Sequence, residues 1–515
     1  MSALGQMVET QVSRVDGAMA SAARHLLSLQ KAEGFWWGDL TADSTLESDF
    51  ILMELWLHPP AQGQARWEPP TRASIDKACR RILSQQLPDG GFNIYAGGPA
   101  DVSATTKAYF ALKVSGYDVD DPCMRAARER ILALGGFQAC NSYVKLNLSF
   151  FGLYPRQFVP SIPPEMMLVP GGWLYEMSSW SRAIVVPLSV VHAKDPKRPV
   201  PDGFNLEELF RPDIPLSFPK AANLISWRNF FYGVDAALKL WDRFGSARLR
   251  RMGVDRAMNW ALERTQQSDG LGAIYPAMMY LIMALDLMGY SRESEEFREA
   301  LGQFERLKVE TDDDLFFQPC FSPVWDTAIA AFSLADSGRA TPGALRHAAD
   351  WLLTKEVRRK GDWSVKRPDT EPSGWYFEFA NEFYPDIDDT GMVLMALARS
   401  EASDPAAHRA CIDRAVNWLL DMQSSDGGWA AFDVDNNLLP LSYIPFADHN
   451  AMLDPTCADI TGRVMEALIM CGVDPKHPAI RKGVAYLRKT QEPDGSWYGR
   501  WGVNYLYGTC FALRG

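Results

Sequence analysis

The chain has 515 residues, with 52 Lys and Arg against 64 Asp and Glu, and a formal net charge of −12. This acidic balance argues against a dedicated nucleic-acid-binding protein, whose phosphate contacts need a basic face. With 47% hydrophobic and 23% charged residues, the composition excludes a largely disordered chain. A single core stops growing at this length, so we expect two large domains. The 17 Trp residues require either structural positions that demand them or a cavity that uses them.

The N-terminal segment 1–17 lacks the apolar stretch of a signal peptide, and no apolar run is long enough to span a bilayer. The eight cysteines are scattered, with no CxxC pair and no completed zinc spacing. We therefore expect no metal site, reduced thiols, and a protein that is soluble or bound to one membrane face.

One pattern recurs along the chain: an amphipathic, helix-like stretch ends in Gln and is followed by a polar turn with Gly and, in most copies, an aromatic residue. It occurs, in chain order, as SLQKAEGFWWG at Gln30, SQQLPDGGF at Gln86, RTQQSDGLG at Gln266, DMQSSDGGW at Gln423 and KTQEPDGSW at Gln491. The Gly of the PDG and SDG turns supplies a positive φ after a helix C-terminus. We expect the Trp residues to brace the helix ends and the Gln amides to bond terminal carbonyls.

The stretches after these turns carry apolar residues at i, i+3, i+4 and i+7, which predicts helices that start from a Thr or similar cap. They span residues 105–118, 328–338, 390–400 and 461–472. The step of 68 residues from Gln423 to Gln491 leaves room for two helices with their connections, which is typical of stacked helix pairs. Because strand-like alternation is rare, we predict an all-α protein whose helix hairpins close into rings.

Three carboxylates, Asp386, Asp388 and Asp389, open the helix predicted at 390–400. Helix capping explains acidic residues at such a position. A functional interpretation stands beside it, because three caps exceed the need of one helix and crowded carboxylates keep one of them protonated. Aromatic residues gather just upstream, at Trp375, Tyr376, Phe377, Phe379 and Phe383. An acid beside an aromatic, apolar pocket suits the protonation of something apolar.

On these motifs the sequence resembles the squalene–hopene cyclases, which are class II triterpene cyclases. Asp386-Ile387-Asp388-Asp389 matches the D-x-D-D motif of the family, and the Gln-to-Trp repeats match its signature repeats. Further family-like stretches are SPVWDT at 322–327, GDWSVKRP at 361–368, GGWAAFDVDN at 427–436 and GRWGVNYLYGT at 499–509. The resemblance implies two α/α barrels with the active cavity between them. Residues 1–38 and 306–515 would form the barrel with the acid motif, and residues 39–305 the inserted barrel.

The implied reaction is protonation of a terminal double bond of squalene, ring closure, and proton loss to give hopene or water capture to give hopanol, without a cofactor. Asp388 matches the general acid, and Asp386 and Asp389 would position it and share its charge. Arg463 occupies the place of the basic residue that assists the acid, and Asp459 would pair with Arg463. A permanent cation there favours the carboxylate left after proton donation. A mere helix salt bridge of Arg463 stays as the alternative.

The resemblance also assigns the cavity wall, where aromatic faces stabilise cations without trapping them. The matching residues are Trp180, Trp325, Phe377, Phe432, Trp501 and Tyr507. Simple core packing is the alternative for each of them. Asp49 and Tyr275 match polar residues at the far end of the cavity, near final deprotonation or water capture. Phe446 and Val185 match the constriction between the entry channel and the cavity.

Because squalene is insoluble in water, the resemblance implies a peripheral or monotopic protein on the cytoplasmic face of the inner membrane. Segment 224–232 mixes aromatic residues with an Arg, as interfacial segments do, although a buried amphipathic helix has the same pattern. No nucleic-acid partner is expected, and a second copy of the chain is a possible partner.

The family pattern continues past the position of Gly515 through further repeats, so we expect an incomplete first barrel with uncovered apolar helix faces. Three interpretations stay open. They are an active squalene–hopene cyclase, a class II cyclase for another prenyl chain, and a truncated toroid that binds lipid or protein without catalysis.

Overall fold

The computed structural model describes residues 3–216, 220–444, 447, 451–502 and 504–515. The α-helices are α1 (Ala3–Leu29), α2 (Thr45–Leu57), α3 (Arg72–Ser84), α4 (Val102–Val114), α5 (Pro122–Ala133), α6 (Ser142–Phe150), α7 (Ser179–Lys194), α8 (Trp227–Phe244), α9 (Ala247–Glu263), α10 (Tyr275–Met288), α11 (Glu295–Arg306), α12 (Pro323–Asp336), α13 (Pro342–Leu353), α14 (Ile387–Leu397), α15 (Pro405–Asp421), α16 (Ala458–Met470), α17 (Pro478–Thr490) and α18 (Asn504–Arg514). Short 3₁₀ helices are η1 (Phe137–Ala139), η2 (Arg156–Phe158), η3 (Pro164–Leu168), η4 (Trp173–Glu176), η5 (Glu207–Leu209), η6 (Leu271–Ala273), η7 (Asp362–Val365) and η8 (Leu439–Tyr443). The strands are β1 (Lys308–Glu310) and β2 (Leu315–Phe317). No helix in the described part of the chain combines the length and the apolar character that a membrane span requires.

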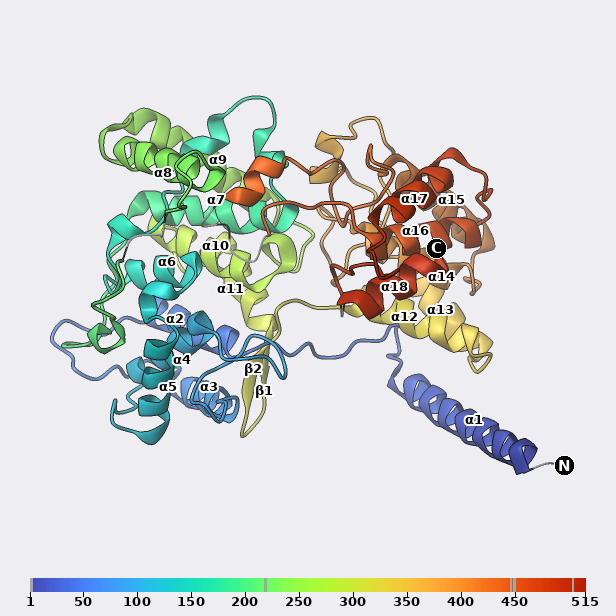
Figure 1. Cartoon of the computed structure of the whole chain (residues 1–515), viewed down its shortest axis with the longest axis horizontal. Helices are drawn as coiled ribbons and strands as arrows, with labels where there is room; N and C mark the ends of the chain where they lie inside the picture. Colours follow the sequence, from blue (N-terminus) through green and yellow to red (C-terminus); the bar gives the residue numbers. More distant parts are fainter. Residues whose placement is uncertain (1–2, 217–219, 445–446, 448–450, 503) are drawn as a thin grey trace.

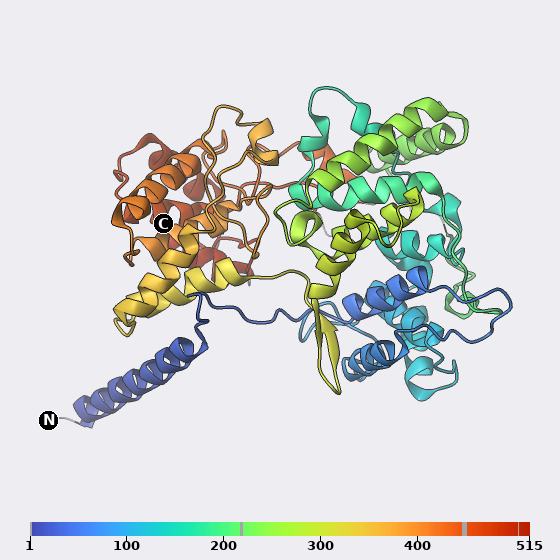
Figure 2. The same cartoon turned by 180° about the vertical axis from the view of Figure 1, so that it is seen from behind.

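Figure 1 shows two helical lobes, one built from α2–α11 and the other from α12–α18. Buried apolar side chains form two clusters that largely follow the same division. The antiparallel hairpin β1–β2, with Lys308 opposite Phe317, lies where the chain passes from the first lobe to the second (Figure 2). Helix α1 projects from the second lobe, and its end is held there by Gln30, whose Nε2 donates to Ala344 O at 2.9 Å.

Helix pairs stack in the second lobe. Helices α12, α14, α16 and α18 pack against one another in chain order, and α13, α15 and α17 pack beside this row. Helix α14 is buried along its whole length, whereas α15 and α17 bury one face only. Since β1 and β2 are the only strands among the described residues, the prediction of an all-α fold with two helical barrels is confirmed.

The repeated turns fold alike. Their Gly residues have positive φ, for example 82° at Gly90 and 94° at Gly427, a region that L side chains disfavour. The Trp indoles donate at 2.7 Å to carbonyls in the last turn of the preceding helix: Trp36 to Leu26, Trp429 to Leu419 and Trp497 to Leu487. The predicted bracing role of the repeat Trp residues is therefore confirmed.

The repeat glutamines bond differently from the prediction. Gln423 Nε2 donates to Gly427 O of its own turn at 2.8 Å and to Ala479 O at 2.9 Å, at the start of α17. Gln86 makes the same two contacts, to Gly90 O and to Cys123 O at the start of α5. Because the Trp indoles occupy the helix-end carbonyls, the amides of Gln86 and Gln423 instead connect their turns to the outer helix of the next pair.

The threonines predicted as caps lie inside the first helical turn. The hydroxyl oxygens of Thr105, Thr390 and Thr461 accept the backbone N–H of the aromatic residue of a preceding turn, each at 3.0 Å. Helices α4 and α14 are capped by Asp101 and Asp386 instead. The predicted Thr caps are therefore wrong, because these Thr hydroxyls bond the backbone of a preceding turn, while an Asp caps α4 and α14.

Candidate active site

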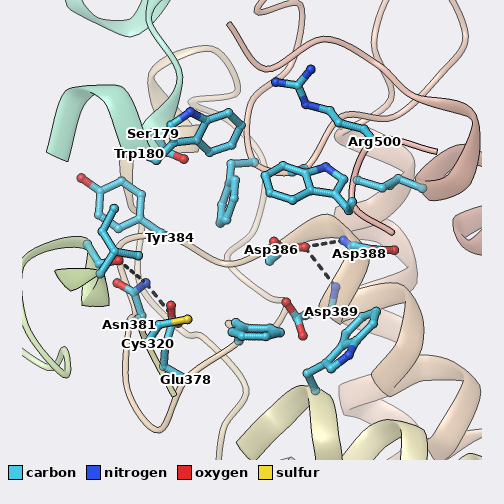
Figure 3. Close-up of a pocket in the computed structure, with 18 of the residues that line it drawn as sticks. Ser179, Trp180, Cys320, Glu378, Asn381, Tyr384, Asp386, Asp388, Asp389 and Arg500 are labelled. Atoms are coloured by element: carbon cyan, nitrogen blue, oxygen red, sulfur yellow. Dashed lines mark hydrogen bonds between the residues drawn. The ribbon is translucent and has the colours of Figure 1, made fainter. Parts of the chain in front are cut away.

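A cavity of about 710 Å³ lies between the two lobes, within the size range of small-molecule sites. The first lobe contributes Ser179 and Trp180 at the start of α7. The second lobe contributes Trp325 of α12 and side chains from segments 377–389, 431–432 and 498–507. Figure 3 shows the carboxylates of the acid motif facing this space among aromatic rings.

Asp386 fills a capping position that the fold repeats. Its Oδ1 accepts the backbone N–H of Asp388 at 2.6 Å and that of Asp389 at 3.0 Å (Figure 3). Asp101 caps α4 through the same two N–H groups, two and three residues further on. Capping therefore accounts for Asp386, whereas Asp388 and Asp389 are carboxylates that the helix end does not need.

Asp388 of α14 and Arg463 of α16 form a buried ion pair. Asp388 Oδ1 lies 3.1 Å from Arg463 Nε, and the two side chains are 11% and 2% exposed. The atoms are close without hydrogen-bond alignment, so the contact is one of charge. Arg463 Nη2 donates to Tyr507 Oη at 2.6 Å, and the guanidinium lies 4.7 Å from the Trp325 ring centroid. A mere helix salt bridge is therefore wrong for Arg463, because its partners come from other elements.

The acid motif combines burial with crowding. Burial raises the pKa of Asp388 to about 6, against the lowering effect of the Arg463 charge. The pKa values of Asp386 and Asp389 rise well above their ordinary range, first by burial and then by the neighbouring carboxylates. The cation beside Asp388 thus favours its ionised form, whereas burial and crowding disfavour the ionised forms of Asp386 and Asp389.

The predicted pair of Asp459 with Arg463 is wrong. Asp459 Oδ2 accepts the backbone N–H of Arg500 at 2.9 Å and of Trp501 at 3.1 Å, and Arg463 pairs with Asp388 instead. Asp459 thereby fixes the segment that carries Trp501 into the cavity wall. Its charge also raises the pKa of Asp388.

The six aromatic residues predicted for the wall all line the cavity: Trp180, Trp325, Phe377, Phe432, Trp501 and Tyr507. Trp180 meets Phe432 edge-on at a centroid distance of 5.8 Å and Trp501 at 5.3 Å. The wall therefore offers ring faces and edges on several sides, an arrangement that suits a large apolar ligand and positive charge developing on it.

Comparison with known proteins agrees with this geometry. Residues 19–313 match the squalene-hopene cyclase N-terminal domain, and residues 321–515 match the squalene-hopene cyclase C-terminal domain. The chain belongs to the squalene–hopene cyclase family. The squalene–hopene cyclase of Bradyrhizobium diazoefficiens is 39% identical over 97% of this chain and 76% of the relative. Those of Zymomonas mobilis and Alicyclobacillus acidocaldarius are each 37% identical, over 97% and 95% of this chain and 76% of each relative.

Two residues assigned from the family lie outside the described lining of the cavity. Asp49 is inside α2 and pairs with Lys107 Nζ at 2.6 Å, in the core of the first lobe. Tyr275 opens α10, packs on Phe304 and donates to Leu46 O at 3.0 Å. Neither side chain is in the described lining of this cavity, and the assignment of both to its far end stays a prediction.

The predicted constriction is described only in part. Phe446 lies outside the described residues. Val185 is on α7, two residues beyond Ala183, which lines the cavity, but Val185 is not among the described lining residues.

Several polar residues that line the cavity were not predicted from the sequence: Ser179, Cys320, Glu378, Asn381, Tyr384 and Arg500. Asn381 Nδ2 donates to Glu378 Oε2 at 3.2 Å on the side of the cavity where Cys320 also lies (Figure 3). Glu378 and Asn381 interrupt the aromatic stretch before the acid motif, a signal that could have found them. Ser179 and Cys320 carry no such local signal. In the described chain no group of three or more His, Cys, Asp and Glu is arranged to hold a metal ion.

Proposed function

We propose that this chain converts squalene to hopene, hopanol or both, with Asp388 as the proton donor. The observation that carries the proposal is a buried carboxyl, with a pKa raised to about 6 and a fixed cation beside it, in the wall of an aromatic cavity. Squalene is preferred over another prenyl chain because the three relatives described above carry its name.

The first step is donation of the Asp388 proton to a terminal double bond. An isolated alkene is a very weak base, so the donor must be neutral before the step and well stabilised after it. Burial keeps the acid neutral, and Arg463 at 3.1 Å stabilises the carboxylate that remains. Asp386 holds the start of α14 in place, and Asp389 shares the charge of the group.

The cations that follow are stabilised by the aromatic wall. Trp180, Phe432 and Trp501 form one contiguous group of rings, and the ring centroids of Trp325 and Phe377 lie 6.2 Å apart with the rings tilted by 43°. Ring faces attract positive charge without forming a bond to it, so ring closure can continue until a proton is lost or water adds.

We propose the domain division that the sequence predicts, in which residues 1–38 join residues 306–515 in one barrel and residues 39–305 form the inserted barrel. Two contacts support this assignment of the N-terminal segment. Gln30 Nε2 donates to Ala344 O at 2.9 Å, and the Trp36 backbone N–H donates to Thr327 Oγ1 at 2.9 Å.

The membrane surface, on the cytoplasmic side of the inner membrane, is the second proposed partner, and α8 supports it. Leu224 and Ile225 are 85% and 92% exposed, and Phe230 and Phe244 are exposed on the helix that follows. The one fully buried residue of α8 is Asp235, so this helix turns apolar residues outward and contradicts a buried amphipathic helix. The predicted second copy of the chain stays a prediction.

The test is gas chromatography–mass spectrometry of squalene incubated with the protein in mild detergent. The wild-type chain is expected to form a pentacyclic product, and Asp388→Asn to lose about 10²–10⁴-fold in rate. Asp101→Asn, the same substitution at the N-cap of α4, outside the described lining of the cavity, is the control and keeps the activity. Circular dichroism checks that all three proteins are folded. A folded wild-type chain without product, or an Asp388→Asn variant as active as the wild type, would contradict the proposal.

A further inference from the structure

Four charged side chains meet behind the cavity wall, two from each lobe. Arg182 of α7 binds Asp433 with both terminal nitrogens, at 2.9 and 3.3 Å, and its Nε donates to Asp362 at 3.2 Å. Arg264, which follows α9, donates to Asp362 Oδ1 from Nε at 2.9 Å and from Nη2 at 2.5 Å. We call Arg182, Arg264, Asp362 and Asp433 the charge quartet. Every ion pair within it joins the first lobe to the second.

The charge quartet is buried and balanced. The side chains of Arg182, Asp362 and Asp433 are 0%, 1% and 4% exposed, and that of Arg264 is 7% exposed. Two cations face two carboxylates, so the group carries no net charge. Asn436 Nδ2 also donates to Asp433 Oδ2 at 3.3 Å, which occupies a further acceptor position. Pairing and hydrogen bonding of this completeness are what a buried ionic group requires.

Three members of the quartet, Arg182, Asp362 and Asp433, are connected to segments of the cavity wall. Arg182 is two residues after Trp180 on α7, and Asp433 directly follows Phe432. The backbone N–H of Asp362 donates to Phe383 O at 3.2 Å. Phe383 directly precedes Tyr384, which lines the wall, and lies three residues before the cap Asp386. The quartet thus connects three separate wall segments, one of which leads into the acid motif.

We propose that the charge quartet positions the cavity wall, with the Arg182–Asp433 pair fixing Trp180 of one lobe against Phe432 of the other. The proposal rests on the proposed function and names positioning residues for it. A two-pronged contact between guanidinium and carboxylate fixes orientation as well as distance, whereas a single contact leaves rotation free. The Trp180–Phe432 edge-on contact at 5.8 Å crosses between the lobes, so its geometry depends on how the lobes are locked together.

The consequence for the reaction is fidelity in the later steps. Initiation depends on Asp388 and Arg463, which the quartet does not contact. The later cations are stabilised by aromatic rings, and these rings must stay within a fraction of an ångström of their positions while the cation changes shape. Loosening the quartet therefore lets cations lose a proton early, and products with fewer than five rings accumulate.

The test compares the double variant Arg182→Met/Asp433→Asn with the wild type. The double variant removes one charge of each sign and leaves Arg264 paired with Asp362, so no buried charge is uncompensated. We expect squalene to be consumed while the share of incompletely cyclised products rises about tenfold. Arg182→Lys, which keeps the charge and loses the two-pronged contact, is expected to shift the products in the same direction and serves if the double variant does not fold.

The matched control is Lys366→Met/Glu176→Gln. This pair also joins the two lobes, at 3.2 Å, but its side chains are 21% and 34% exposed. The control is expected to keep the wild-type product pattern. A wild-type pattern in the folded quartet variants, or an equal change in the control, would overturn the proposal.

A second measurement does not depend on turnover. The backbone N–H groups of Phe432 and Asp433 donate to Asp454 at 2.7 and 3.0 Å. Their hydrogen–deuterium exchange is expected to become faster in the quartet variants and to stay unchanged in the control. Unchanged exchange in the quartet variants would overturn the proposal. A wild-type chain without product but with this exchange difference would contradict the proposed function alone.

Discussion

At Asp388, burial and the charge of Arg463 act in opposite directions on the same carboxyl. Burial favours the neutral acid that must exist before proton donation, and the cation favours the anion that exists after it. Burial dominates, and the pKa rises to about 6. Because the raised pKa keeps the proton on Asp388 up to about pH 6, turnover should fall as the pH rises through that value.

Removing the charge of Arg463 should raise the pH at which turnover falls. In Arg463→Gln the carboxylate of Asp388 loses its stabilising charge, so its pKa rises further, by about one unit. The falling limb of the pH–rate profile shifts to higher pH, and the maximal rate drops about tenfold or more because the acid is weaker. Initial rates of squalene consumption between pH 5 and pH 8 measure both effects.

Arg409→Gln is the control for this substitution, since Arg409 lies on α15 and pairs with Asp413 at the surface. Arg409→Gln should change neither the pH of the falling limb of the pH–rate profile nor the maximal rate. A limb that stays at the wild-type pH in Arg463→Gln, or moves to lower pH, would show that Arg463 does not act on the donor.

Some residues of the site could be predicted from their neighbours in the sequence, and others could not because their partners are distant in the sequence. Asp386, Asp388 and Asp389 could be predicted because they are adjacent in the sequence and the helix that follows is strongly periodic. The partner of Asp459 could not, because it is the backbone of residues 500–501, brought in by a loop 41 residues further along. The family pattern predicted the aromatic residues of the cavity wall, whereas Asp49 and Tyr275, which it also assigned to the cavity, contact Lys107 and Leu46 within the first lobe.

Among the elements, the repeated turn contains three residue types that each bond a different group. The indole N–H groups take the helix-end carbonyls, the Thr hydroxyls take the N–H of the aromatic residue, and the Gln amides bridge to the next outer helix. The sequence identifies the turn and its Gly, because these are local properties. It does not identify the Gln partner, because Ala479 lies 56 residues away from Gln423.

Two copies of the turn give a graded prediction of stability. Gln423 makes two hydrogen bonds, one of them to a buried residue at the start of α17, whereas Gln491 makes one bond at the surface. Gln423→Ala should therefore lower the free energy of unfolding by about 1–3 kcal/mol, because it leaves a carbonyl unpaired. Gln491→Ala should cost well under about 1 kcal/mol.

Urea unfolding followed by circular dichroism measures the difference, with the same slope expected for both variants. The two substitutions remove identical atoms, so each serves as the control of the other. Equal losses would contradict the bridging role, and a larger loss at Gln491 would reverse it.

Over the whole molecule, an insoluble substrate requires both a catalytic acid and a contact with lipid, and the two lobes supply one each. The second lobe carries the acid motif, and the first carries α8 at its outer end, away from α12–α18 (Figure 1). The cavity lies between them and takes wall residues from both. Locking the lobes together therefore fixes the site, while the exposed apolar face of α8 can contact lipid without disturbing it.

Leu224→Ser/Ile225→Ser tests the lipid contact at this scale. The two side chains are 85% and 92% exposed, so their replacement should leave folding and turnover in detergent unchanged. Each would contribute on the order of 1 kcal/mol of apolar burial in a lipid interface, so binding to phosphatidylcholine vesicles should weaken about tenfold or more. Sedimentation with vesicles that contain squalene measures the bound fraction, and turnover on the same vesicles should fall in parallel.

Leu506→Ser/Leu513→Ser removes a similar exposed apolar surface from α18, where the two residues are 84% and 71% exposed. Vesicle binding of this control should match the wild type, because α18 belongs to the other lobe. Equal weakening in both double variants would mean that any exposed apolar surface of the protein binds lipid. Weakening in the α18 variant alone would move the membrane contact to the second lobe, next to Tyr507 and the cavity wall.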